Sequence, residues 1–253
     1  MLCRAFEQWF HQLLDIGEYE RADASMNGLQ VGRREKSLKR IALAVDASAE
    51  TFRRAVDGGA DALVVHHGLF WGKPIAVTGS HHQRISLLLE HDIALFAAHL
   101  PLDAHQEVGN NAAIAAAVGL RDIKPFGEYH GLMIGLQGIL DEALGVPEIL
   151  QLLGWEDEPD ITVLPFGPDR IRRIGVVSGG AAGSVHQAIQ QGCDLFITGE
   201  SSHQVYHTCL ESRIHMIAGG HYRTETYGVQ QLGRRIEQET DISTFFIDLP
   251  TGL

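Results

Sequence analysis

Cysteine, proline, aromatic residues and long apolar runs are all scarce in this chain of 253 residues, and these scarcities exclude several classes of protein. Its three cysteines, Cys3, Cys193 and Cys209, are odd in number and far apart, so they suit neither a disulfide framework nor a paired-cysteine zinc knuckle. No apolar run approaches the ~20 residues of a membrane helix. The first residues carry acids early, unlike a secretory signal peptide. We therefore expect a protein of the reducing cytoplasm.

Positive charge is scarce as well. The sequence has 20 Lys and Arg against 32 Asp and Glu, a formal net charge of -12. Sequence-independent binding to DNA or RNA needs a basic surface that releases counterions from the phosphates, so this balance argues against nucleic acid as a partner. A bound divalent ion could still attract one phosphate or carboxylate, which keeps a small anionic substrate compatible with the sequence.

The residues that are abundant indicate an α/β protein. The chain is 45% hydrophobic and contains 28 glycines, and many short apolar runs are separated by Gly or Asp. This composition suits frequent tight turns between strands and helices. The length is enough for a full core in one large domain or in two small domains that are closely fused.

An internal repeat divides the chain. Residues 39–67 align with residues 172–200 without a gap, although few positions are identical. Both segments read as a basic start, an apolar strand, a small-residue turn, an amphipathic helix and a second apolar strand. The likeness resumes between residues 93–103 and 215–225, where an apolar strand ends near His and a carboxylate follows four positions later. Chance similarity between two β-α-β units is the alternative, but it would not explain the matching His and acid positions.

The repeat predicts the domain organisation. We expect two related α/β halves with a dinuclear metal site between them, the first half covering residues 1–125 and the second, with a connecting segment, covering residues 126–253. Within residues 120–170 the sequence predicts a strand, a short helix and another strand, which would extend the sheet or connect the halves. Proline and glycine place the boundary somewhere between 125 and 170.

Two adjacent histidines follow an apolar strand in the first half. Successive side chains of a strand point to opposite faces, so His66 and His67 could reach one centre only where the strand has ended and the backbone turns. Gly68 permits such a turn, and open α/β sheets bind ligands at this end of their strands. Neutral imidazole is the commonest metal ligand, so each histidine could bind one of two ions. A capping or surface pair is the alternative.

Carboxylates stand at matching places in both halves. Asp103 is expected on a loop at a strand end, before a helix that starts near Asn110. A helix beginning near His221 would bring Glu225 onto the same face one turn later, a spacing that suits chelation. The alternatives are a loop-bracing aspartate and an ordinary surface His/Glu pair.

Together these residues form a donor set without thiolate. His66, His67, Asp103, His221 and Glu225 suit two divalent ions per chain, and the candidate ions are zinc, manganese and iron. Five ligands are too few to close two coordination spheres, so water would fill the remaining positions. Glu225 is the candidate bridge between the ions.

Other polar residues compete for roles at this site. His99 and Glu200 occupy the repeat positions of His221 and His67, so we expect them either to support the metal ligands or to act as acid/base groups in catalysis. His81 and His82 lie in a polar stretch beside glycine and are expected in a solvated loop. Asn27 precedes glycine and would brace a turn.

Five segments in order resemble the family of GTP cyclohydrolase 1 type 2 homologues, also called NIF-three-like proteins. The likeness covers nearly the whole chain. At 253 residues the chain resembles the short form of the family, which has no inserted middle domain. The resemblance implies a dinuclear metal site with the five ligands given above, and a ring-shaped homohexamer. The segments are NGLQVG (27–32), GADALVVHHGLFW (59–71), HLPLDAHQEVGNN (99–111), DLFITGE (194–200) and GHYRTE (220–225).

The family name does not by itself define a reaction. A GTP cyclohydrolase of the well-known type has cysteine metal ligands and residues that recognise guanine, and no matching set is found in this sequence. The leading hypothesis is a metal-dependent hydrolase of a small, nucleotide-like substrate. The alternative is a noncatalytic metal-binding or scaffold protein, which the absence of a GxxxxGK[ST] phosphate-binding motif favours.

Overall fold

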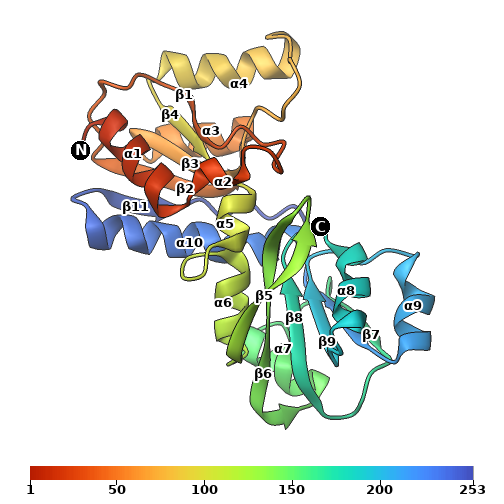
Figure 1. Cartoon of the computed structure of the whole chain (residues 1–253). Coiled ribbons are helices and arrows are strands. Elements are labelled where there is room, and N and C mark those ends of the chain that lie inside the picture. Colours follow the sequence, from red (N-terminus) through yellow and green to blue (C-terminus); the bar gives the residue numbers. More distant parts are fainter. Residues whose placement is uncertain (253) are drawn as a thin grey trace. The chain divides into compact units, whose positions relative to one another are not determined.

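The computed structural model describes residues 1–252, which form two compact units (Figure 1). Unit 1 consists of Met1–Leu102 and Gly228–Leu249, and unit 2 consists of Asp103–Tyr227 together with a short stretch from Pro250 on. The sequence-based division at residue 125 follows the repeat along the chain, whereas these units follow spatial compactness. The helices α5 (Leu100–Ala104) and α10 (His221–Glu239) each begin in one unit and end in the other.

Unit 1 is built on a five-stranded sheet with the order β1-β4-β3-β2-β11. Strand β1 is antiparallel to β4, and the other pairs are parallel. Apolar β-branched and alanine residues fill the central strands, which are buried on both faces, as parallel sheets require. The strands are β1 (Gly28–Val31), β2 (Arg40–Asp46), β3 (Ala62–His67), β4 (Ala94–Ala97) and β11 (Ser243–Phe246).

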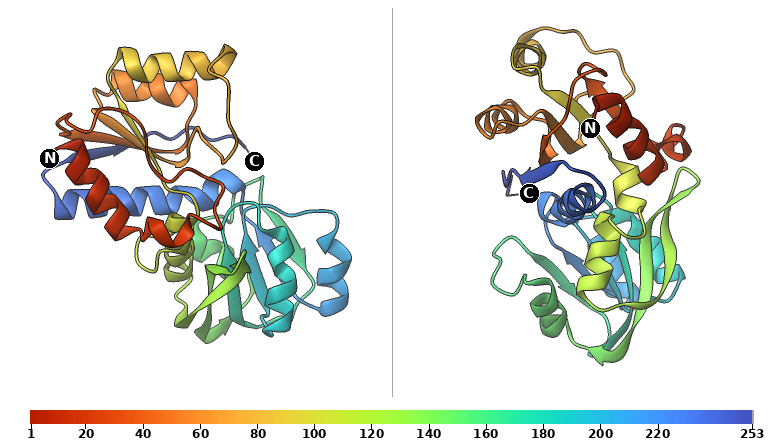
Figure 2. Two further views of the ribbon diagram at one scale, coloured as in Figure 1. Left: turned by 45° about the horizontal axis from the view of Figure 1, so that its top comes forward. Right: turned by 90° about the vertical axis from the view of Figure 1, so that its left-hand side faces the viewer.

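Helices cover both faces of this sheet (Figure 2). Phe52 and Leu88, from the pair α3 and α4, pack in one cluster with alternate residues of the strands. On the other face, Phe96 of β4 contacts Phe6 edge-on with ring centroids 5.0 Å apart, and Leu43 faces Gly233 of α10. The helices are α1 (Cys3–Leu13), α2 (Ile16–Tyr19), α3 (Ala49–Asp57) and α4 (Gly79–Glu90).

Unit 2 is built on a six-stranded sheet with the order β5-β6-β8-β9-β10-β7. Its central strands β8, β9 and β10 are parallel, while β5, β6 and β7 pair with antiparallel neighbours. The strands are β5 (Arg121–Tyr129), β6 (Leu132–Leu144), β7 (Thr162–Pro165), β8 (Ile171–Val177), β9 (Leu195–Thr198) and β10 (His215–Ala218).

One face of the unit-2 sheet carries an extensive apolar core. Ile114 of α6, Ile149 of α7 and Trp155 pack there against alternate strand residues such as Ile174. On the opposite face Phe126 and Phe196 meet with ring centroids 6.1 Å apart. The helices are α6 (Asn110–Ala117), α7 (Val146–Leu153), the 3₁₀ helix η1 (Ala182–Ser184), α8 (Val185–Gln190) and α9 (Val205–Ser212).

The repeat predicted from the sequence is confirmed in the two sheets. The parallel strands β2, β3 and β4 of unit 1 correspond to β8, β9 and β10 of unit 2, in the same neighbour order. An antiparallel strand borders each set, β1 beside β4 and β7 beside β10. The predicted strands and helix between 120 and 170 are β6, α7 and β7, and the strands extend the second sheet. Among residues 1–252, no helix is long and apolar enough to cross a membrane.

Candidate metal centre

Histidines and acids gather where the parallel strands of unit 1 end. Strand β2 ends at Asp46, β3 ends at His67, and His99 follows two residues after the end of β4. Parallel strands finish at one edge of the sheet, which is where open α/β sheets bind ligands. The expectation that His66 and His67 lie beyond the strand is wrong: they are its last two residues, because His67 pairs with Asp46 in the parallel ladder.

Three imidazoles of unit 1 form one group. The ligand atoms of His66, His67 and His99 lie within 4.8 Å of one another. The two histidines of β3 lean towards different neighbours: Nδ1 of His66 is 2.8 Å from the carbonyl oxygen of Ala98, and Nδ1 of His67 is 2.9 Å from Oδ1 of Asp46. These acceptors favour the tautomer in which Nδ1 donates its proton, so that Nε2 carries the lone pair that a metal ion needs.

Asp23 holds His99 in the same way. Its carboxylate, on a side chain that is 1% exposed, accepts a hydrogen bond of 2.9 Å from Nδ1 of His99. It also accepts hydrogen bonds from Nδ2 of Asn27 and from the backbone N–H groups of Ser25 and Leu100. Burial alone would raise the pKa of Asp23, but these bonds, led by that from His99, hold it below its ordinary value. The ionised carboxylate therefore orients the imidazole.

A second group lies in unit 2 at the start of α10. The helix begins at His221, as the sequence predicted, and one turn later Oε1 of Glu225 is 3.1 Å from Nε2 of His221. Nδ1 of His221 bonds to Oε1 of Glu200. The hydrogen bond to Glu225 raises the pKa of His221 to about 9 against the effect of burial, and Glu200 adds to the rise. Glu200 and Glu225 lie on either side of this imidazole and favour its protonated form. Two carboxylates so placed mark a position where a cation is favoured.

Asp103 belongs to this second group. It lies in the short helix α5 and not on a loop as expected, because the residues after His99 wind into a turn of helix. The carboxylate is buried, and its Oδ1 accepts hydrogen bonds from Nδ2 of Asn110 at 2.9 Å and from Oγ of Ser178 at 2.8 Å. A ligand atom of Asp103 lies within 4.8 Å of one of Glu225.

A glycine makes room for the buried carboxylate of Glu225. The backbone of Gly179 has a φ of +66°, and a Cβ atom at this position would lie 2.3 Å from Oε1 of Glu225. The N–H of Gly179 donates to Oγ1 of Thr224 at 3.0 Å, which fixes the glycine beside the helix start. A larger residue could not occupy this position without moving Glu225.

The donor atoms fit divalent ions of borderline to hard character. Imidazole nitrogens and carboxylate oxygens gather in the two groups, whereas Cys3, Cys193 and Cys209 are buried free thiols. Burial raises the pKa of all three thiols, so they are poor sources of a thiolate ligand. This donor chemistry suits zinc, manganese or iron.

The structure corrects the prediction for His81 and His82 and extends the role of Asn27. His81 is buried within α4, and its ring packs edge-on against Phe70 with centroids 5.5 Å apart, so the prediction of a solvated loop is wrong for this residue. The helix starts at Gly79 and turns His81 inward. His82 is exposed, as predicted, but it lies in the same helix and not in a loop. Asn27 does more than brace a turn, because its Oδ1 accepts a hydrogen bond from the backbone N–H of His99.

Sequence reasoning missed several residues that orient the candidate ligands. Asp46 could have been found, since it ends a strand that runs parallel to the strand of His67. Asp23 and Ser178 gave no local signal, because each meets its partner only after the chain folds: Asp23 and His99 are 76 positions apart, and Ser178 and Asp103 are 75 apart. Asn110 is seven positions from Asp103, but the sequence indicated only that a helix starts near it.

The sequence of this chain matches a known family model along nearly all of its length. The model is described as Duf34/NIF3 (NGG1p interacting factor 3) and matches residues 1–251. The chain belongs to this family. Among its Duf34/NIF3 relatives, proteins of Deinococcus radiodurans and Archaeoglobus fulgidus are each 44% identical and are named GTP cyclohydrolase 1 type 2 homolog. The alignments cover 97% of this chain in both cases, and 92% and 97% of the respective relatives.

Solved structures show the same fold. The protein ybgI, described as of unknown function, is 33% identical with a TM-score of 0.90, and both chains are covered completely. A Thermus thermophilus protein is 36% identical with a TM-score of 0.86, again with complete coverage. The reduced form of HcgD from Methanocaldococcus jannaschii has a TM-score of 0.84 over 98% of each chain, but at 24% identity it supports the fold alone. These likenesses confirm the family resemblance and the mixed α/β fold.

Proposed function

We propose that this protein binds two divalent ions through His66, His67, Asp103, His221 and Glu225, and hydrolyses a small, nucleotide-like molecule. The observation that carries the proposal is the group of three imidazoles in unit 1. The proposed ligands His66 and His67, and His99 beside them, each have an acceptor on Nδ1, which leaves an Nε2 lone pair available. Histidines in an ordinary capping or surface position do not need three separate hydrogen-bond acceptors on Nδ1.

Two such ions, when bound, lower the pKa of a water molecule and polarise the bond that it attacks. The residues of this chain would hold the ions and orient the water molecule. Glu225, buried beside His221, supplies a carboxylate that can bridge two cations. Asp103 is kept in place by Asn110 and Ser178. The assignment of these five ligands to two ions rests on the family resemblance.

His99 and Glu200 are the proposed acid/base groups. Nε2 of His99 carries the lone pair, since Asp23 accepts the proton of Nδ1, so this nitrogen can take a proton from water or act as a sixth ligand. Glu200 is exposed and bonds to His221, from which it can receive or return a proton. Metal content decides between the two roles of His99: loss of an ion in His99→Ala assigns it as a ligand, and full occupancy with lost hydrolysis assigns it as a base.

Hydrolysis is tested with the metal-loaded protein and a panel of phosphoesters, nucleotides and cyclic amides, with Glu225→Ala as the matched inactive variant. We expect turnover that requires the added metal and is lost in the variant. If the wild-type protein hydrolyses nothing on the panel with zinc, manganese or iron, the noncatalytic metal-binding or scaffold function replaces the enzyme.

The proposed assembly is a toroidal homohexamer, which rests on the family resemblance. Light scattering at micromolar concentration should give six times the 27.7 kDa mass of the chain. A stable monomer would contradict both the ring and any scaffold function that depends on it.

A further inference from the structure

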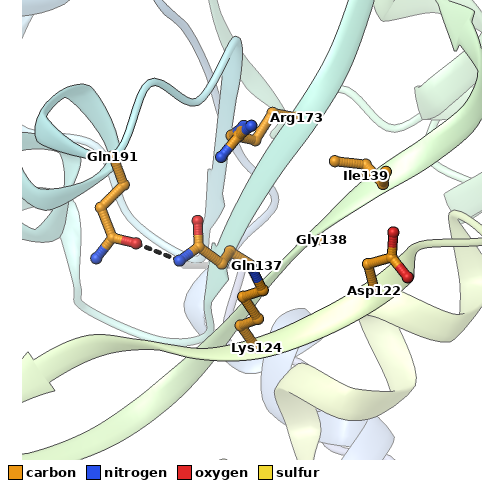
Figure 3. Close-up of a pocket in the computed structure, with 7 residues that line it drawn as sticks. All are labelled: Asp122, Lys124, Gln137, Gly138, Ile139, Arg173 and Gln191. Atoms are coloured by element: carbon orange, nitrogen blue, oxygen red, sulfur yellow. Dashed lines mark hydrogen bonds between the residues drawn. The ribbon is translucent and has the colours of Figure 1, made fainter.

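A separate pocket lies on the sheet of unit 2, over strands β5, β6 and β8 (Figure 3). Its volume is about 510 Å³, which is within the range of small-molecule sites. Strand β8 reaches the candidate metal centre at its carboxyl end, near Ser178, whereas the pocket includes Arg173 near its amino end. Five strand residues span roughly 16 Å, so the pocket and the metal ligands are distinct places.

Strand register explains why the lining residues share one face. Lys124 of β5 pairs with Gln137 of β6, and Arg173 of β8 pairs with Ile139 of β6. Residues directly opposite in antiparallel strands point to the same face, as do residues two apart in one strand. All four side chains therefore stand on the face opposite the core that contains Leu136.

Two cationic side chains reach the pocket without a counterion. Both Lys124 and Arg173 are exposed, and within residues 1–252 neither side chain has a hydrogen bond or an ion pair. Nearby Arg121, in contrast, pairs with Asp141 at 3.5 Å. The pocket thus has two cations against the single carboxylate of Asp122, in a chain with a net charge of -12. They make this pocket locally attractive to an anion.

A hydrogen-bond chain orients two amide donors beside these cations. Nε2 of Gln137 donates to Oε1 of Gln191, as Figure 3 shows, and the thiol of Cys193 lies 4.0 Å from Oε1 of Gln137. Burial raises the pKa of Cys193 to about 11, so the sulfur keeps its proton and can donate it. The oxygens of both amides are thus engaged, and the Nε2 atom of Gln191 remains to donate to a ligand.

One acceptor completes the lining. Asp122 lies at the irregularity between β5 and β6, with a φ of +50° in the left-handed region. Such a bulge redirects a side chain at a strand edge, and here Asp122 lines the pocket. Its carboxylate would repel an anionic group but can accept hydrogen bonds from hydroxyls.

We propose that this pocket binds a small organic anion, whose phosphate or carboxylate contacts Lys124 and Arg173 and whose hydroxyl groups face Asp122. The pocket is larger than a bare phosphate needs, and Ile139 offers an apolar wall for the carbon skeleton. Binding here does not depend on the proposed metal ions or on hydrolysis.

The test follows the δ1 methyl resonance of Ile139 in the full protein during titration with glycerol 3-phosphate, glycerate and uncharged glycerol. A saturable shift with either anion and none with glycerol is expected, and the two anions distinguish phosphate from carboxylate. In the double variant Lys124→Gln/Arg173→Gln the affinity should fall about tenfold or more, because two charge-assisted contacts are lost. Arg53→Gln, an exposed arginine in unit 1, should leave it unchanged.

The proposal is overturned if neither anion gives a saturable shift below about 10 mM, a weak affinity by any standard, or if the double variant binds as tightly as wild type. Both replaced side chains are exposed, so equal melting temperatures will show that the fold is retained. Metal loading should not change the affinity, which separates this site from the proposed centre.

Discussion

The two units repeat one arrangement of strands but place different chemistry at the strand ends. In unit 1 the end of β3 carries His67, which Asp46 orients; in unit 2 the matching positions are Glu200 and Gly179. Where unit 1 uses a carboxylate to hold an imidazole, unit 2 uses a glycine to admit the carboxylate of Glu225. The repeated strand arrangement therefore specifies the positions of the candidate residues. The residue types at these positions determine which donor atoms each unit supplies.

The same contrast appears after the third strand of each set. His99 in unit 1 is anchored by a buried aspartate outside the repeat, Asp23, whereas His221 in unit 2 bonds to the two glutamates Glu200 and Glu225. Unit 1 is thus a group of oriented imidazoles, and unit 2 is a carboxylate group around one imidazole. The two units should therefore respond differently to substitution.

The largest effect is expected from the carboxylates of unit 2. Glu225→Ala and Asp103→Ala should each lose at least one of two metal equivalents and all hydrolysis, because the negative charge that balances the ions is removed. The fold should survive, since neither residue is part of an apolar core. His82→Ala, an exposed histidine, is the control; His81 is unsuitable because it is buried. Full metal occupancy in both carboxylate variants would refute the ligand assignment.

A smaller effect is expected when the proposed ligands of unit 2 are kept but a neighbouring residue is enlarged. Gly179→Ala puts a methyl group where Oε1 of Glu225 lies and strains a left-handed backbone, so we expect metal affinity to fall about 10–100-fold with about 1–2 kcal/mol of lost stability. Gly183→Ala is the matched control, because a Cβ there has nothing within 4 Å. Equal affinities measured by competition with a chelator would show that Glu225 does not need this space.

In unit 1 the sharpest test is the anchor of His99. Asp23→Asn keeps the shape but removes the charge, so the preference of His99 for the Nδ1-protonated form should weaken and metal affinity should fall about tenfold. The ¹⁵N resonances of His99 report its tautomer directly, a signal that a merely structural role would not change. An unaltered tautomer together with unaltered affinity would mean that Asp23 only braces the loop.

The sequence was sufficient for the repeat and for the places of the candidate ligands in the fold, because both depend on local patterns. An apolar strand that ends in histidine, or a His and Glu one helical turn apart, can be recognised without the fold. The sequence also pointed to Asp103 but not to its helix, which contains Pro101 in its first turn, a position where proline is tolerated. The loop prediction for His81 was wrong because a helix with only one buried side has mostly polar residues in this stretch, as a solvated loop does.

The residues that orient the ligands could not be predicted in this way. Asp23 has no periodicity to mark it, and its four hydrogen bonds join the loop around Ser25 to His99 and Leu100, which lie far along the chain. The pocket on the unit-2 sheet is equally hidden, since it depends on the register of three strands and on a bulge at Asp122. Long-range pairing, and not residue type, creates both features.

The central proposal is that His66, His67, Asp103, His221 and Glu225 bind two metal ions, and metal stoichiometry tests it most directly. Folded protein is saturated with zinc, manganese or iron, freed of unbound metal and analysed for its elemental content. The five proposed ligands are too many for one open tetrahedral site and too few for two closed ones, so the account predicts two ions per chain. A well-folded preparation that binds no more than one equivalent at saturation would contradict it.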